Sequence, residues 1–106
     1  MNAKGYDIVI SDDALAMLDQ HAQFLARVNW NAAKKTVDQI LNDIESLSKL
    51  PERCPFYENA FIPENRYHRL LSSKRYLILY EVSGNTVFVD HILDCRQENK
   101  DSYGCI

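Results

Sequence analysis

The stretch RYLILYEV, residues 75–82, is nearly continuous in aromatic and aliphatic side chains and decides the fold of this 106-residue chain. Such residues favour a β-strand whose side chains are covered. The tripeptide Ser83-Gly84-Asn85 follows, and Gly and Asn tolerate the positive φ of a tight turn. Residues 86–93 (TVFVDHIL) return as a second strand, so the two segments predict a β-hairpin.

Two further strands are predicted outside this hairpin. Residues 66–71 read as a strand directly before it, and the short β-branched segment YDIVI, residues 6–10, reads as a strand near the N-terminus. Between them, residues 51–65 hold three prolines and several aromatic residues. We expect this segment to be an ordered loop that covers one end of the core.

Two helices are expected between the first strand and the loop. Ser11 can cap a helix that begins at Asp12, and apolar residues then recur at spacings of three and four, as they do again in a second helix. Asn29 or Asn31 is expected to cap the second helix, which should stop near Leu50 because Pro51 disfavours a helical residue before it. The two stripes are Leu15, Leu18, Ala22 and Leu25, then Ala33, Val37, Ile40, Ile44 and Leu47.

These elements predict an α+β fold with the order β-α-α-β-β-β, in a single domain over residues 1–106. Two helices reverse the chain twice, so the second strand should run opposite to the first, and the last three strands should form a meander. A helix hairpin packed on one face of a small, mostly antiparallel sheet satisfies this order. The pattern leaves open which strand the first one pairs with.

Composition narrows the functional classes. The formal net charge of −3 argues against a protein that coats nucleic acid non-specifically, so a nucleic-acid site would have to be local. No apolar run approaches the roughly 20 residues needed to span a bilayer, and the N-terminus has no signal-peptide pattern, so a cytoplasmic protein is expected. The cysteines lack metal-type spacing, and we expect neither a metal nor a cofactor.

Three segments of the chain resemble the RelE/ParE superfamily of toxins, also known as plasmid stabilisation proteins. SLSKLP (46–51) looks like the end of the family's helix hairpin. YHRLL (67–71) with RYLILYEV (75–82) looks like its central strands, and VFVDHILDCRQ (87–97) looks like its last strand running into an arginine. The likeness covers nearly the whole chain, and it rests on the ordered set of segments.

The resemblance implies the toxin half of a bacterial type II toxin–antitoxin pair, which inhibits growth. One branch of the superfamily cleaves mRNA in the ribosomal A site, and another poisons DNA gyrase. The expected partners are therefore a cognate antitoxin, with a higher-order toxin–antitoxin complex possible, and either gyrase or ribosome-bound mRNA. The likeness gives the toxin role better than it gives the target.

A local basic patch is the strongest candidate for chemistry. Residues 66–75 hold four cations and His68 without a carboxylate, in an otherwise acidic chain. Cleavage of RNA through its 2′-hydroxyl needs a base, an acid and cations for the phosphorane. The candidate catalytic residues are Arg69, Arg75 and Arg96 on phosphate, with Glu98 or His91 in proton transfer. The candidate substrate or partner surface is Arg66, Lys74, Tyr76 and Tyr103. In the alternative interpretation, these arginines pair with surface carboxylates or with an acidic antitoxin segment.

One departure from the mRNA-cleaving branch weakens the nuclease hypothesis. That branch usually has an arginine after the aromatic residue of the central strand, whereas this chain has Leu77 after Tyr76. Leucine cannot stabilise a phosphorane. Arg75 lies two residues earlier, so on a strand it would share the face of Leu77, displaced by roughly 7 Å.

Three functions follow, in this order of preference. The first is an inhibitor that binds a protein target such as gyrase and needs no catalytic group. The second is a ribosome-dependent, metal-independent endoribonuclease. The third is a non-toxic binding module that keeps only the antitoxin groove.

Overall fold

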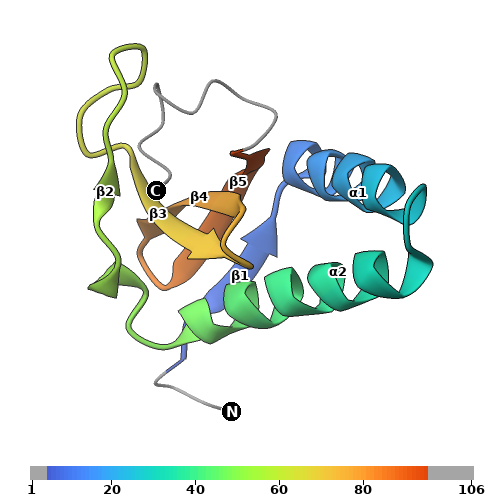
Figure 1. Ribbon diagram of the computed structural model, residues 1–106. Coiled ribbons are helices and arrows are strands. Elements are labelled where there is room, and N and C mark those ends of the chain that lie inside the picture. The colour runs from blue at the N-terminus through green and yellow to red at the C-terminus, as the bar shows by residue number, and fades with distance from the viewer. Residues whose placement is uncertain (1–4, 96–106) are drawn as a thin grey trace.

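The computed structural model describes residues 5–95, which form two helices and a five-stranded sheet (Figure 1). The predicted order is confirmed, with one short strand added in the loop after the helices. The elements are β1 (Asp7–Ile10), α1 (Asp12–Ala26), α2 (Trp30–Glu45), the 3-10 turns η1 (Ser46–Ser48) and η2 (Pro51–Arg53), β2 (Phe56–Tyr57), β3 (Tyr67–Ser72), β4 (Tyr76–Ser83) and β5 (Thr86–Asp94).

The strand order in the sheet is β1-β5-β4-β3-β2. The pairs β3–β4 and β4–β5 are antiparallel, as the meander predicted, and the unpredicted β2 pairs antiparallel with β3. The expectation that the second predicted strand, β3, runs opposite to the first was wrong, because β1 is parallel to β5 and β5 runs in the direction of β3. The structure also decides the question that the sequence left open, since β1 pairs in parallel with β5 and Ile8 lies opposite Val87. The register of β4 and β5 shifts beside Leu79 and Tyr80, where Asp90 is the extra residue.

Side-chain caps define the start of each helix. The Ser11 hydroxyl accepts the Ala14 N–H at 3.0 Å, and the Asn29 side-chain oxygen accepts the Ala32 N–H at 3.0 Å. The second helix ends at Glu45 and continues into η1, five residues before the predicted stop. Within residues 5–95, neither helix is long and apolar enough to cross a membrane.

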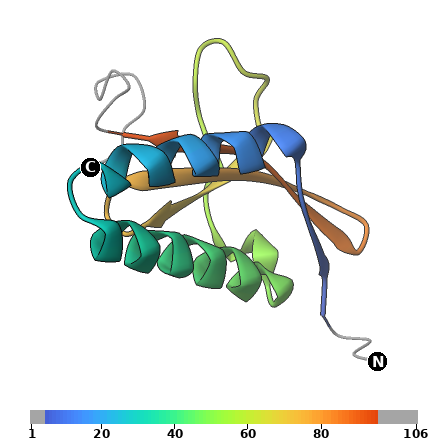
Figure 2. The same cartoon turned by 90° about the vertical axis from the view of Figure 1, so that its right-hand side faces the viewer.

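The helix hairpin packs on one face of the sheet, and its closed end extends beyond the strands (Figures 1 and 2). The core between them joins one face of α1 and α2 to the helix-facing side chains of the sheet. The Tyr80 hydroxyl reaches out of this core and donates to the Pro51 carbonyl at 2.5 Å, and burial raises the pKa of Tyr80. The buried members of the core are Ala14, Leu18, Ile40, Ile44, Leu47, Tyr76, Ile78, Tyr80, Val87, Val89 and Ile92.

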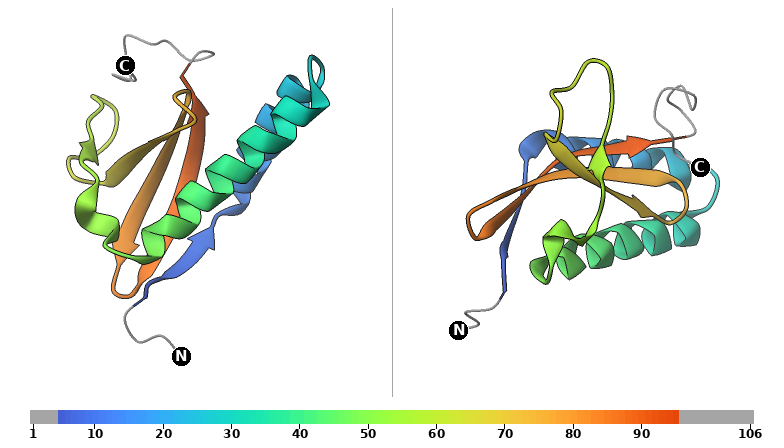
Figure 3. Two further views of the ribbon diagram at one scale, coloured as in Figure 1. Left: turned by 60° about the horizontal axis from the view of Figure 1, so that its bottom comes forward. Right: turned by 90° about the vertical axis from the view of Figure 1, so that its left-hand side faces the viewer.

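A second apolar cluster covers the other face of β3 and β4. It contains Tyr57, Tyr67, Leu77, Leu79 and Cys95, and the loop between β2 and β3 lies on this side of the sheet, away from α2 (Figure 3). The prediction of a simple loop over residues 51–65 was therefore incomplete. It missed β2, because two residues are too few to show a period of two in sequence.

Candidate functional site

Arg75, one of the predicted phosphate-binding residues, is held in an ion pair just before the start of β4. Its Nε donates to Asp94 Oδ1 at 2.9 Å and its Nη2 donates to Asp94 Oδ2 at 2.8 Å. Asp94 is 2% exposed at the end of β5, and the hydrogen bond with it raises the pKa of Arg75. The guanidinium also lies 5.3 Å from the ring centre of Tyr76 and 5.9 Å from that of Phe24.

The backbone explains why Arg75 makes this pair. The expectation that it opens the strand was wrong, because Arg75 belongs to the turn before β4. Its N–H donates to the Ser72 carbonyl at 3.2 Å and its carbonyl accepts the Cys95 N–H at 2.9 Å, which brings it beside the end of β5. The bidentate fork that would bind a phosphate is therefore filled by Asp94.

Arg69 lies on the opposite face of the sheet from this pair. It is opposite Leu79 in the register of β3 and β4, and Leu79 belongs to the second cluster, whereas Asp94 is opposite Tyr76 of the main core. Arg69 and Arg75 thus do not face a common phosphate. A catalytic role for either one alone stays a prediction.

His91 and Leu77 share the face of Arg69. The His91 ring packs edge-on against Tyr67, with the ring centres 5.5 Å apart. Leu77 is 2% exposed inside the second cluster. The position at which the mRNA-cleaving branch has an arginine is therefore filled by a buried apolar side chain.

Arg66 is paired at the other end of the basic patch. Its Nε lies 3.4 Å from Glu81 Oε1, and the charge of Glu81 is the main cause that raises the pKa of Arg66. Desolvation, followed by a hydrogen bond with Asp90, raises the pKa of Glu81, and Arg66 partly opposes that rise. The alternative interpretation of the patch, in which arginines pair with carboxylates of this chain, holds for Arg66 and Arg75.

The remaining predicted residues are divided between turn, core and termini. Lys74 is exposed in the turn between β3 and β4, with a positive φ of 58°. Tyr76 is buried in the main core, 5.0 Å from the ring of His21, so the surface expected at Tyr76 is not formed. Arg96, Glu98 and Tyr103 lie outside the described residues. Among residues 5–95, no three His, Cys, Asp or Glu side chains come together as metal ligands.

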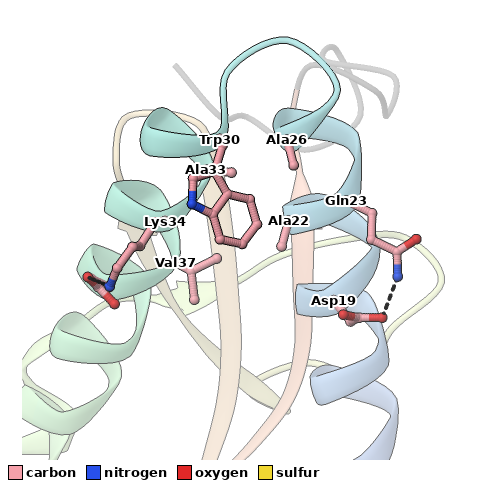
Figure 4. Close-up of a pocket in the computed structure, with 9 residues that line it drawn as sticks. Asp19, Ala22, Gln23, Ala26, Trp30, Ala33, Lys34 and Val37 are labelled. Carbon is pink, nitrogen blue, oxygen red and sulfur yellow. Dashed lines mark hydrogen bonds and ion pairs between the residues drawn. The ribbon is translucent and has the colours of Figure 1, made fainter.

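A groove between the two helices was not predicted from the sequence. This hairpin groove has a volume of about 440 Å³, and in Figure 4 the Trp30 indole of α2 lies across from Ala22 and Ala26 of α1. Trp30 is 70% exposed, and Val28, in the loop that joins the helices, is 89% exposed. The groove is lined by Asp19, Ala22, Gln23, Ala26, Trp30, Ala33, Lys34, Val37 and Asp38.

The wall of the hairpin groove is apolar and its charges lie on the rim. Lys34 pairs with Asp38 at 3.6 Å along α2, and the Gln23 amide donates to Asp19 at 2.8 Å along α1. Each of these pairs joins two residues of the same helix, so neither pair bridges the groove. The small side chains between the helices are therefore left uncovered. An exposed tryptophan beside an Asn cap was the one signal in the sequence that could have pointed to this surface.

Comparisons with known proteins assign the chain to a family. The family model described as the ParE toxin of the type II toxin–antitoxin system, parDE, matches residues 8–99. Among solved structures, a chain described as the chromosomal ParDE toxin–antitoxin system from P. aeruginosa superposes with a TM-score of 0.71 at 15% identity, covering 87% of this chain and 98% of that one. The comparison with curated protein sequences found no match. The likeness to the RelE/ParE superfamily is therefore confirmed, and this chain belongs to the ParE toxin family of type II toxin–antitoxin systems.

Proposed function

We propose that this toxin inhibits bacterial growth by binding a protein target such as DNA gyrase, without cleaving RNA. It would act in the cytoplasm, where its antitoxin holds it inactive, and such a pair would serve to stabilise a plasmid or another replicon. The observation that carries the proposal is the Arg75–Asp94 pair, because it leaves the described residues without the cluster of cations that a phosphorane needs.

The buried Leu77 supports the same conclusion independently. A ribonuclease of the related branch needs a cation at this strand position, and a charge there would have to lose its water inside an apolar cluster. A target-binding inhibitor needs only a complementary surface. The hairpin groove supplies one that has an exposed tryptophan, a residue type that dominates binding energy at interfaces.

The same surface argument supports an antitoxin partner. Phe24, Val28 and Trp30 are exposed at or near the closed end of the helix hairpin, and exposed apolar surface of this kind is usually covered by a partner. Complexes of stable toxin–antitoxin type bury over roughly 2,000 Å². Competition between antitoxin and target for one surface would explain how the antitoxin silences the toxin.

The test is controlled expression of the full chain in bacteria, with and without the reading frame beside its gene. We expect growth arrest that the neighbouring frame relieves, with gyrase-linked DNA breaks and intact messages. Cleavage of ribosome-bound message, lost in Arg69→Ala, would overturn the proposal in favour of the endoribonuclease. Growth that continues at full rate would favour the non-toxic binding module.

Two aromatic variants make this test specific for the hairpin groove. Trp30→Ala should strongly reduce the number of gyrase-linked breaks. Phe61→Ala, which removes an even more exposed aromatic from the loop after β2, should leave them unchanged. Equal activity of the two variants would exclude the hairpin groove as the target surface.

A further inference from the structure

A pocket of about 280 Å³ lies at the end of the sheet where η2 and β2 meet the start of β3 and the end of β4. It is separate from the hairpin groove, since β2 and the closed end of the helix hairpin lie on opposite sides of the molecule in Figure 1. Its volume is slightly below the roughly 300–1,000 Å³ of pockets that hold drug-sized ligands, so it suits a single side chain. We call it the β2 pocket, and it is lined by Glu52, Phe56, Asn65, Arg66, His68, Glu81 and Val82.

His68 is the buried polar group of the β2 pocket, with 7% of the residue exposed. Its neighbours across the sheet cover both ring faces, Phe56 with the ring centres 4.3 Å apart and Tyr80 at 5.2 Å. Nδ1 lies 2.7 Å from the Cys54 carbonyl, which can only accept, so Nδ1 carries the proton and donates. The neutral ring keeps a lone pair on Nε2, which has no hydrogen-bond partner within residues 5–95. The ring edge that carries Nε2 is therefore the part that lines the pocket.

The other groups of the β2 pocket favour a ligand that carries positive charge. Glu52 is exposed, and its carboxylate forms no ion pair in the described part of the chain. Phe56 is 40% exposed, so part of its ring is open to a cation. Arg66 is balanced by Glu81, 3.4 Å away, and its guanidinium lies 5.1 Å from the ring centre of Tyr67. The charge of Glu52 is thus the one that the lining of the pocket leaves unbalanced.

We propose that the β2 pocket binds the guanidinium group of an arginine side chain from a partner protein. A guanidinium carries several N–H donors in one plane, which suit the Nε2 lone pair of His68 and the carboxylate of Glu52. Its flat face suits the exposed part of the Phe56 ring, whereas an ammonium is a compact charge without such a face. The inference goes beyond the proposed growth inhibition, which depends on the hairpin groove.

Other classes of ligand fit the β2 pocket poorly. A phosphate would approach Arg66, but it would also face the Glu52 carboxylate and the lone pair of His68, and like charges repel. A metal ion would lack ligands, because among residues 5–95 no three His, Cys, Asp or Glu side chains come together to hold one. Charge and hydrogen-bonding complementarity therefore select a positively charged organic group.

The probe is a capped glycine–arginine–glycine tripeptide, added to the full-length, ¹⁵N-labelled protein. We expect the ¹⁵N resonance of His68 Nε2 to shift in a saturable way, with half-saturation on the order of 10 mM peptide. The ring nitrogens of His21 and His91, which do not line the pocket, should not shift. The same peptide with citrulline keeps the shape of arginine without its charge and should bind about tenfold more weakly. Equal binding of the two peptides, or no shift at His68, would overturn the proposal.

Charge variants test the lining of the β2 pocket. Glu52→Gln should weaken binding of the arginine peptide about fivefold. Glu58→Gln, a matched change at an exposed glutamate outside the pocket, should leave the affinity unchanged. Arg66→Ala frees Glu81 for the peptide and should tighten binding about threefold. Weaker binding by Arg66→Ala would identify an anion site and overturn the proposal.

Two further outcomes decide the occupant of the β2 pocket. Equal affinity for a capped glycine–lysine–glycine peptide would overturn the choice of a guanidinium over an ammonium. A shift of His68 Nε2 that grows with protein concentration, without any peptide, would identify a second copy of this chain as the occupant and overturn the assignment to a partner protein. Because growth is not measured, failure here would leave the proposed growth inhibition standing.

Discussion

The Arg75–Asp94 pair and the hairpin groove differ in how their side chains are satisfied. At the start of β4, a strongly charged residue finds its counter-charge within the chain. In the hairpin groove, by contrast, the large aromatic side chain of Trp30 remains mostly exposed to solvent. We infer from this difference that Arg75 serves the fold and that the surface available to partners is apolar.

The largest expected effect tests the folding role of Arg75. Arg75→Ala leaves the buried Asp94 carboxylate without its bidentate partner, which should cost about 3–5 kcal/mol of unfolding free energy. Urea denaturation of the purified protein measures this loss. Arg66→Ala removes an exposed ion pair and should leave the midpoint unchanged. Equal midpoints for both variants would contradict a structural role for Arg75.

The next effect tests the binding role of the hairpin groove. Trp30→Ala should weaken binding to the target or antitoxin by about 2 kcal/mol, because a large aromatic anchor is lost from an interface. Its unfolding free energy should change by less than about 0.5 kcal/mol, since the side chain is mostly exposed. Isothermal titration and urea denaturation measure the two quantities. If Trp30→Ala instead lowered the unfolding free energy and left the affinity unchanged, Trp30 would serve the fold and not binding.

A smaller effect concerns the turn that carries Arg75. Ser73 and Lys74 both have positive φ, of 55° and 58°, in a turn type that prefers Asn-Gly. Ser73→Asn with Lys74→Gly should therefore raise the unfolding free energy by roughly 1 kcal/mol. Thermal denaturation measures this gain in stability. The control is Asn85→Ala in the β4–β5 turn, where Gly84 already takes the positive φ, and this variant should not raise the unfolding free energy.

The smallest effect is a pH dependence at Glu81. Its pKa in the folded protein is raised above the ordinary value of 4.5 by burial, so the folded state binds this proton more tightly than the unfolded state. The resulting stabilisation is complete below pH 4.5 and is lost as the pH rises through the raised pKa. Glu81→Gln should flatten that decline, by less than about 1 kcal/mol. An unchanged slope in urea titrations at several pH values would contradict it.

The sequence was sufficient for most of the fold because each element depends on local signals. The caps at Ser11 and Asn29 set both helix starts, and the apolar residues of β4 with the turn at Gly84 set the central hairpin. The strand β2 was missed because two residues carry no periodicity. The early end of α2 was missed because Pro51 marks only the limit of the helical segment, while η1 takes up the last turn.

The candidate site was less predictable because it depends on which side chains meet. By itself, the sequence determined the ParE-like order of elements, the buried faces and the local excess of cations, since these follow from residue type and spacing. Only the tertiary structure decided that Arg75 meets Asp94, that β1 joins β5 and that His68 lines the β2 pocket. Ion pairs and strand neighbours link residues far apart in the chain, and no local pattern encodes such distances.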